Sequence, residues 1–457
     1  MGSNRLTEGS IWRALVRLSL PIMSTSFVQM AYNMTDMIWI GRIGSKAVAG
    51  VGTAGFFTWL AMAFILIPKI GAEVGVAQST GKKDVAATKA HIVHALQIGI
   101  FLAFLYSIPL ILFKNQLIGF FNLGDTEVIS MAETYLVITA FGMIFNFMNP
   151  VFTAILNGYG NSSTPFYINV IGLVVNMVLD PVLILGVGPF PAMGVAGAAI
   201  ATVGAQFLVM LVFLFRIKKI MPLFKEINIA QKPDREKVIS IFKLGIPAAL
   251  QSGCFTIFAM IIARIIAQWG PVAIAVQKIG SQIEAVSWMT AGGFSTALSA
   301  FVGQNYGAGK HERIYRGYFV AMGIVGAIGV LTTVLLIFGA KPIFSRFIDE
   351  QEAITYGVVY LKILGISQFF MCMEIATAGA FNGLGKTVPP AIIGILLNAL
   401  RIPAALILSN ENLLGLNGVW WSISISSILK GIILTTWFAL YLGKNYRVVN
   451  VEAKYSG

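Results

Sequence analysis

Two aspartates interrupt apolar stretches of this sequence, where a carboxylate is costly to bury. Asp36 lies in YNMTDMIWIG, residues 32–41, and Asp180 lies in NMVLDP, residues 176–181. An aspartate at the centre of a membrane-spanning helix costs about 3 kcal/mol, so such a residue is a candidate functional group. Two carboxylates held close together suit a proton, because both cannot easily stay charged. With an amide and a hydroxyl, the same oxygens also suit Na⁺, and the sequence leaves H⁺ and Na⁺ open.

Further polar residues lie at matching positions. Asn176 lies one turn before Asp180, on the same face of a helix. Thr202 lies in the next apolar segment, at a comparable depth. We predict that one ion-coupling site contains Asp36, Asn176, Asp180 and Thr202. The alternative is that each acid lies near a helix end and reaches the interface or pairs with a base there.

A polar stripe follows the helix that carries the first acid. Four residues recur every three or four positions through this apolar segment: Gln29, Tyr32, Asn33 and Asp36. The first three are predicted substrate contacts, together with Glu284 in a later apolar segment. Pro21 precedes the stripe on the same helix, and it removes a backbone donor and favours a bend. It is either a moving hinge or a static kink.

The composition indicates that these residues belong to a membrane protein. The 457 residues are 57% hydrophobic and 11% charged, with a mean hydropathy of +0.81, whereas a soluble domain is about 25% charged. Apolar runs long enough to cross roughly 30 Å of hydrocarbon as helices recur throughout. We predict an all-α integral membrane protein with twelve transmembrane helices, near residues 14–40, 47–75, 89–113, 130–157, 163–185, 194–216, 240–268, 271–302, 314–340, 354–382, 387–408 and 416–442.

The basic residues indicate how the chain crosses the membrane. If the N-terminus is inside, 20 Lys and Arg residues fall in inside segments and five in outside segments. The positive-inside rule then places both termini in the cytoplasm of a multi-pass cell-membrane protein. This distribution accounts for the net charge of +13 without a nucleic-acid partner. Membrane lipid is the expected partner of the basic stretch at residues 216–237.

Four sequence blocks recur in the same order, at an offset of about 222–226 residues. VGVAQSTGKKD at residues 74–84 matches SAFVGQNYGAGK at 299–310, and NMVLDP matches NALRIP at 398–403. Each half holds six spans, so the two lobes share one orientation and are related by a pseudo-two-fold axis along the membrane normal. Parallel repeats of this kind are typical of transporters.

The repeat predicts three parts of the chain: an N-terminal six-helix lobe at residues 1–220, a cytoplasmic linker at 221–237 and a C-terminal six-helix lobe at 238–457. Departures from the repeat then mark the site. Asp36 falls opposite Ile262, and Asp180 falls opposite Ile402. Both carboxylates therefore belong to the N-terminal lobe only.

Motifs along nearly the whole chain resemble the MATE family (multidrug and toxic compound extrusion). They are LSLP at residues 18–21, YNMTD followed by IG in the first helix, NMVLDP in the fifth, and GQNYGAG at 303–309. Within the family, the chain resembles the branch that includes the DNA-damage-inducible and archaeal members. The resemblance implies a multidrug efflux antiporter that exports organic cations or amphipathic drugs in exchange for H⁺ or Na⁺ by alternating access. We expect a monomer without a cofactor.

Residue roles carry over at matching positions. The resemblance implies ion coupling by the four residues predicted above: Asp36, Asn176, Asp180 and Thr202. Gln29 and Tyr32 match pocket-lining positions, and Pro21 matches a proline implicated in bending. The other large branch has a glutamate in the seventh helix where this chain has Phe255, so the resemblance does not extend to a cation site of that kind.

Other function classes fit the sequence less well. A lipid-linked oligosaccharide or lipid flippase of related fold is the alternative, kept open by three basic residues of the C-terminal half: Arg264, Lys278 and Arg401. An enzyme is not expected, because the chain has no H-E-x-x-H, G-x-S-x-G or Walker motif. Cys254 and Cys372 lie singly in apolar segments and predict neither a disulfide nor a metal site. Some of the charged residues in apolar segments of the C-terminal half are candidates for structural ion pairs: Lys278, Glu284, Glu374, Arg401 and Lys430.

Overall fold

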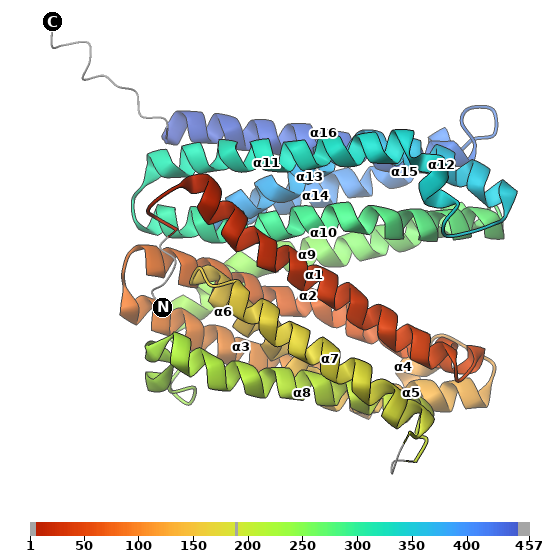
Figure 1. Ribbon diagram of the computed structural model, residues 1–457, viewed down its shortest axis with the longest axis horizontal. Coiled ribbons are helices and arrows are strands. Elements are labelled where there is room, and N and C mark those ends of the chain that lie inside the picture. The colour runs from red at the N-terminus through yellow and green to blue at the C-terminus, as the bar shows by residue number, and fades with distance from the viewer. Residues whose placement is uncertain (1–5, 188–190, 447–457) are drawn as a thin grey trace, which may run out of the picture. The chain divides into compact units, whose positions relative to one another are not determined.

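The fold is helical throughout the residues that the computed structural model describes, 6–187 and 191–446. No strand occurs among them (Figure 1). Helices satisfy their backbone hydrogen bonds within one segment, which apolar surroundings require. The predicted all-α fold class is confirmed.

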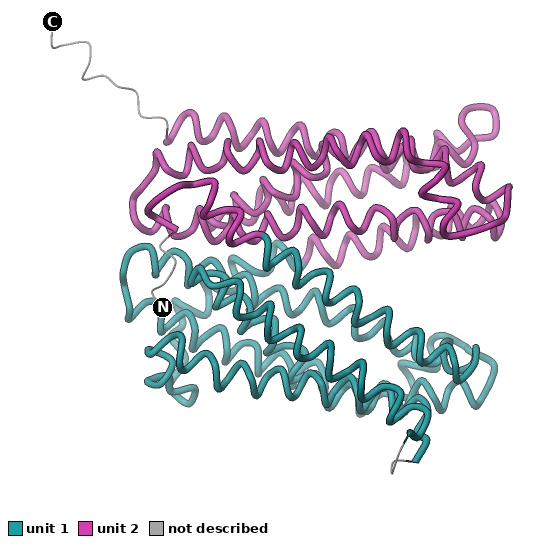
Figure 2. Tube along the Cα trace, in the orientation of Figure 1, with its two compact units in different colours: residues 1–5, 20–249 teal, residues 6–19, 250–457 magenta. Residues whose placement is uncertain are grey.

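The chain divides into two compact units, coloured separately in Figure 2. Among the described residues, unit 1 comprises 20–249, and unit 2 comprises 6–19 and 250–446. Helix α1 (Ile11–Gly41) begins in unit 2 and continues in unit 1, whereas α9 (Arg235–Ala267) begins in unit 1 and continues in unit 2. The other elements of unit 1 are α2 (Ser45–Gly81), α3 (Val85–Leu112), α4 (Lys114–Gly119), α5 (Thr126–Phe141), α6 (Met143–Gly158), α7 (Ser163–Leu185), α8 (Gly194–Ile220) and the 3₁₀ helix η1 (Pro222–Glu226). Those of unit 2 are α10 (Pro271–Gly307), α11 (His311–Phe338), α12 (Ala340–Phe344), α13 (Gln351–Gly383), α14 (Val388–Ala399), α15 (Arg401–Leu408) and α16 (Leu416–Asn445).

Each of the twelve predicted spans corresponds to a helix or a helix pair. Ten described segments are long and apolar enough to cross a membrane, with α14 and α15 forming one of them. The pair α5 and α6, bent by 48°, makes an eleventh. Helix α10 covers the remaining predicted span with 37 residues and carries Lys278 and Glu284, and it is not among these segments.

The repeat reappears in the bounds of the helices. Helices α10 and α11 begin and end at the positions of the repeat that match the ends of α2 and α3, and α13 spans the region that matches α5 and α6 together. The repeated Asn-Gly pairs lie at equivalent contacts. A Cβ on Gly158 would lie 2.5 Å from the carbonyl oxygen of Glu73, and one on Gly383 would lie 2.5 Å from that of Ser299. Glycine is required there because small residues let helix backbones approach closely.

One packing contact between two helices occurs in both units, but the helix that provides the ring and the helix that provides the glycine are interchanged. In unit 1, Gly75 of α2 lies against the ring of His91 on α3. In unit 2, the equivalent positions hold Phe301 on α10 and Gly317 on α11, which also touch. Each pair combines one ring with one glycine, so a ring fills the equivalent space in each unit but comes from the opposite helix.

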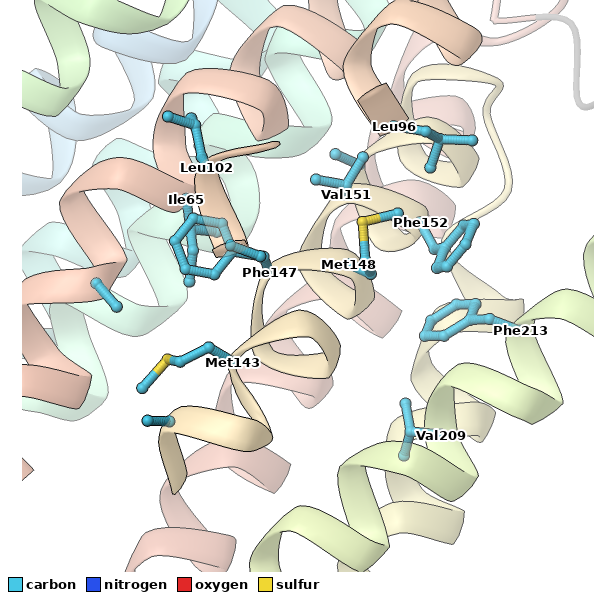
Figure 3. Packing of buried hydrophobic residues seen from close by; sticks show 14 of the residues in the cluster. Ile65, Leu96, Leu102, Met143, Phe147, Met148, Val151, Phe152, Val209 and Phe213 are labelled. Carbon is cyan, nitrogen blue, oxygen red and sulfur yellow. The ribbon is translucent and has the colours of Figure 1, made fainter. Parts of the chain in front are cut away.

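The apolar core of unit 1 is built around α6 (Figure 3). Phe147 and Phe152 on this helix are buried, and Phe152 stacks on Phe213 of α8 with ring centroids 5.7 Å apart. Helix α6 is therefore packed against neighbours through its apolar residues.

The segment before α1 is anchored to unit 2 through its backbone. Arg313 donates hydrogen bonds to three carbonyl oxygens, those of Leu6 (3.1 Å), Glu8 (2.8 Å) and Gly9 (2.8 Å). Lys310 donates to the carbonyl of Thr7 at 2.9 Å. In unit 1, Gln97 of α3 likewise donates to carbonyl oxygens before α9, those of Ile229 and Gln231, both at 2.8 Å. Side-chain hydrogen bonds thus hold the backbone just before each of the two helices that pass from one unit to the other.

We predict that Arg313→Gln loosens the segment before α1. Hydrogen bonds from a charged donor contribute about 1.5 kcal/mol or more each, so amide exchange at residues 6–9 should accelerate at least about tenfold. Hydrogen exchange with mass spectrometry measures this rate. The control is Arg316→Gln, because Arg316 lies on the same helix and pairs with the exposed Glu312 instead. Equal exchange in both variants would contradict the anchor.

A second prediction concerns the exposed ion pairs at the start of α2 and α5. The Lys46 ammonium lies 3.0 Å from the Asp125 carboxylate and 2.6 Å from that of Glu127. The hydrogen bond from Lys46, then that from the Glu127 backbone N–H, lowers the pKa of Asp125 below its usual value. A lowered pKa stabilises the fold above about pH 4 and the gain is lost as the pH falls further.

Asp125→Asn should therefore lower the melting temperature slightly at neutral pH, and this difference should shrink as the pH falls below about 4 and Asp125 becomes protonated in the folded state. Asparagine can still cap α5 as Asp125 does, so the variant isolates the charge. Thermal unfolding of the purified protein across pH measures the difference. In a Lys46→Gln background, Asp125→Asn should have little effect, and a full effect there would refute the pairing.

Candidate functional site

The four residues predicted to couple ions lie together in unit 1. Asp36 lies on α1, Asn176 and Asp180 on α7, and Thr202 on α8. The Thr202 hydroxyl donates to Asp36 Oδ2 at 3.1 Å, and Asn176 Nδ2 donates to Asp180 Oδ1 at 3.1 Å. The side chains of Asn176 and Asp180 also interact with that of Asp36. We refer to Asp36, Asn176, Asp180 and Thr202 as the acid cluster.

The acid cluster contains acceptor oxygens that no donor satisfies. Asn176 and Asp180 are 0% exposed, and Asp36 is partly exposed. One oxygen of each is buried without a hydrogen-bond partner: Asp36 Oδ1, Asn176 Oδ1 and Asp180 Oδ2. Buried acceptors without a donor cost about 1–3 kcal/mol each, and more when charged. A proton between the carboxylates, or a small cation held by these oxygens, would remove that cost.

Two tyrosines complete the surroundings of the cluster. Tyr32, which the sequence assigned to substrate, is buried and donates to the carbonyl of Thr202 at 3.2 Å. Tyr135 on α5 is also buried, interacts with the Thr202 side chain and lies within electrostatic reach of both aspartates. The sequence interpretation did not include Tyr135. The repeat could have indicated it, because Tyr360 stands at the matching position of the other half, in an equivalent helix.

The other predicted substrate contacts belong to different units of the chain. Gln29 and Asn33 are exposed on α1. Glu284 belongs to unit 2, where its carboxylate accepts hydrogen bonds from Tyr360 at 2.6 Å and Gln368 at 3.1 Å. The assignment of Gln29, Tyr32, Asn33 and Glu284 to substrate stays a prediction.

Pro21 lies inside α1, which continues through it as one helix. It follows directly on the boundary between residues 19 and 20, where the chain passes from unit 2 to unit 1. Pro247 of α9 lies close to the reverse boundary, at residues 249 and 250. Both prolines thus stand where a helix changes units, and motion at Pro21 stays a prediction.

Buried charges of unit 2 include one clear ion pair. Lys430 Nζ lies 3.0 Å from Glu374 Oε2, and both side chains are nearly buried. Within residues 6–187 and 191–446, no group of three His, Cys, Asp or Glu residues is placed to hold a metal ion. The chemistry available to the acid cluster is therefore that of carboxylate, amide and hydroxyl oxygens.

Comparison with known proteins agrees with this architecture. The chain is 29% identical over 425 residues to a probable multidrug resistance protein NorM of Thermotoga maritima, covering 90% of this chain and 88% of that protein. It is 24% identical to a FAD transporter of Shewanella oneidensis, covering 93% of this chain and 94% of that one. A crystal structure of MATE in the bent conformation has the same fold, with a TM-score of 0.89 at 24% identity over 97% of this chain and 98% of the other.

The family model MatE matches residues 21–182 and 247–407, one stretch in each half of the repeat. These two stretches make up more than half of the chain, and they contain Asp36 and Asp180. The chain therefore belongs to the MatE family, that of the MATE transporters.

Proposed function

We propose that this protein is a secondary active multidrug exporter that releases organic cations or amphipathic drugs in exchange for H⁺ or Na⁺. Membership of the MATE family and the relatives named multidrug resistance proteins support export of small molecules. The acid cluster supports the coupling to an ion. The proposal includes both termini in the cytoplasm, a monomer, and a linker at residues 221–237 between the two lobes.

The observation that carries the proposal is the set of unsatisfied oxygens in the acid cluster. Two carboxylates and an amide each have a buried oxygen without a donor, and unit 1 provides no lysine or arginine that pairs with either acid in the described residues. A permanent base would have neutralised the site. An exchangeable ion can do so reversibly, which is the property that coupling needs.

The proposed exchange of a coupling ion for a substrate follows from the charge of the acid cluster. An ion that enters from outside reduces the negative charge that Asp36 and Asp180 share, which weakens the attraction for a cationic substrate. Its release on the inner side restores the negative charge, and a new substrate can then bind. Thr202 positions Asp36 through its hydroxyl, and Asn176 positions Asp180 through its amide. Each ligand favours a different state, as alternating access requires.

The prediction is that Asp36→Asn and Asp180→Asn each lower ion-driven efflux at least tenfold, a loss of roughly 1.4 kcal/mol or more. Asparagine keeps the shape but cannot carry the exchangeable charge. Export of a fluorescent organic cation such as ethidium is measured in proteoliposomes, with a pH gradient or a Na⁺ gradient imposed separately. The gradient that drives the wild type identifies the coupling ion.

The matched control is Asp349→Asn, which changes an exposed aspartate of unit 2. Undiminished efflux in both acid-cluster variants would refute the coupling site. Flipping of a lipid-linked sugar without export of ethidium by the wild type would refute drug efflux itself.

A further inference from the structure

Unit 2 repeats the framework of unit 1 but carries different charges inside it. Glu374 stands at the position of the repeat that matches Asn149, and it pairs with Lys430 at 3.0 Å. Asn149 instead donates to the neutral side chain of Gln206 at 2.7 Å. Arg401 lies next to Ile402, the position that matches Asp180. Unit 2 therefore has acids and bases where unit 1 has neutral groups or acids alone.

Among the described residues, the hydrogen-bond partners of the Arg401 side chain are two serine hydroxyls. Its Nε donates to Ser426 Oγ at 2.9 Å, and one terminal nitrogen donates to Ser427 Oγ at 3.0 Å. A guanidinium has five N–H donors, so several stay available. No carboxylate among the described residues lies within ion-pair distance of it, although Glu374 and Glu284 both act on it electrostatically. A buried cation is costly without an anion. Arg401 is partly exposed, so an anion from outside the protein could reach it.

Glu284 presents the opposite chemistry in the same unit. Tyr360 and Gln368 hold its two oxygens. Two buried amide oxygens beside them have no donor: Gln277 Oε1, whose side chain interacts with Tyr360, and Gln368 Oε1. Glu284 and Arg401 interact electrostatically but form no direct ion pair. Acceptors around Glu284 and donors around Arg401 are thus both left incomplete.

We propose that Arg401, supported by Ser426 and Ser427, binds the oxyanion of zwitterionic substrates, while Glu284 faces their cationic nitrogen. This inference rests on the proposed efflux function and narrows its substrate class. Within unit 2, a purely cationic ligand would use only Glu284. A ligand that carries both charges would face Glu284 with its cation and accept the spare guanidinium hydrogen bonds with its oxyanion, and charge-assisted bonds to a guanidinium are strong and directional.

Two matched dyes test the proposal. Rhodamine B carries a cationic xanthene and a free carboxylate, whereas its ethyl ester keeps the cation and loses the carboxylate. Binding of each dye to the purified protein is followed by fluorescence titration. Arg401→Gln should weaken rhodamine B binding roughly tenfold to a hundredfold and leave the ester within about twofold. Arg401→Lys, which keeps the charge without the planar fork, should fall between wild type and Arg401→Gln.

Binding of the ester shows that each variant is folded at the site. Equal weakening of both dyes in both variants, or no weakening of either, would overturn the role of Arg401. Glu284→Gln should weaken both dyes, and a selective loss of rhodamine B alone in that variant would also contradict the assignment. Failure of wild-type liposomes to export the ester would refute the efflux function while leaving the dye contrast in binding intact.

Discussion

The cost of a charge in apolar surroundings governs this protein. Most of its helices are apolar enough to lie in lipid, so each ionisable group inside them must be paired, satisfied by hydrogen bonds or left for a ligand. Unit 2 shows the first solution at Glu374 and Lys430. Unit 1 leaves oxygens of its two aspartates without a donor, and we propose that an exchangeable ion fills this place. In that proposal, a structural charge has a permanent counter-ion and a coupling charge has an exchangeable one.

The repeat allows the charges of the two units to be compared at matching positions. The same helix contacts recur at matching positions of the two units, down to the glycines that meet a backbone carbonyl of the facing helix. Where the frameworks agree, close packing explains the residue. Where they differ, as at Asp36 against Ile262, packing does not require the polar group. The exchanged pair of His91 and Gly75 against Phe301 and Gly317 shows that some differences only change which helix provides a ring.

The two helices that change units link the framework to the site. Helix α1 starts in unit 2, where Arg313 holds the preceding backbone, and it carries Asp36 in unit 1. Helix α9 has the reverse course, with Gln97 holding the chain before it. Pro21 and Pro247 lie near the points of passage. A bend at either proline would act on a helix whose leading segment is fixed.

The sequence by itself determined the helical fold, the repeat and the family, because hydropathy, internal similarity and motifs are local properties of the chain. It also indicated Asp36, Asn176, Asp180 and Thr202, since acids in apolar helices are conspicuous. Only the tertiary structure decided which hydroxyl meets which carboxylate, that Tyr32 and Tyr135 belong beside this cluster, and that α1 begins in unit 2. It also showed that Lys430 forms an ion pair with an acid whereas Arg401 hydrogen-bonds to serine hydroxyls. A sequence does not tell which of two buried bases has an acid as partner. Such pairings depend on how helices far apart in the chain are rotated against one another, and that rotation is set by packing rather than by the pattern of one helix.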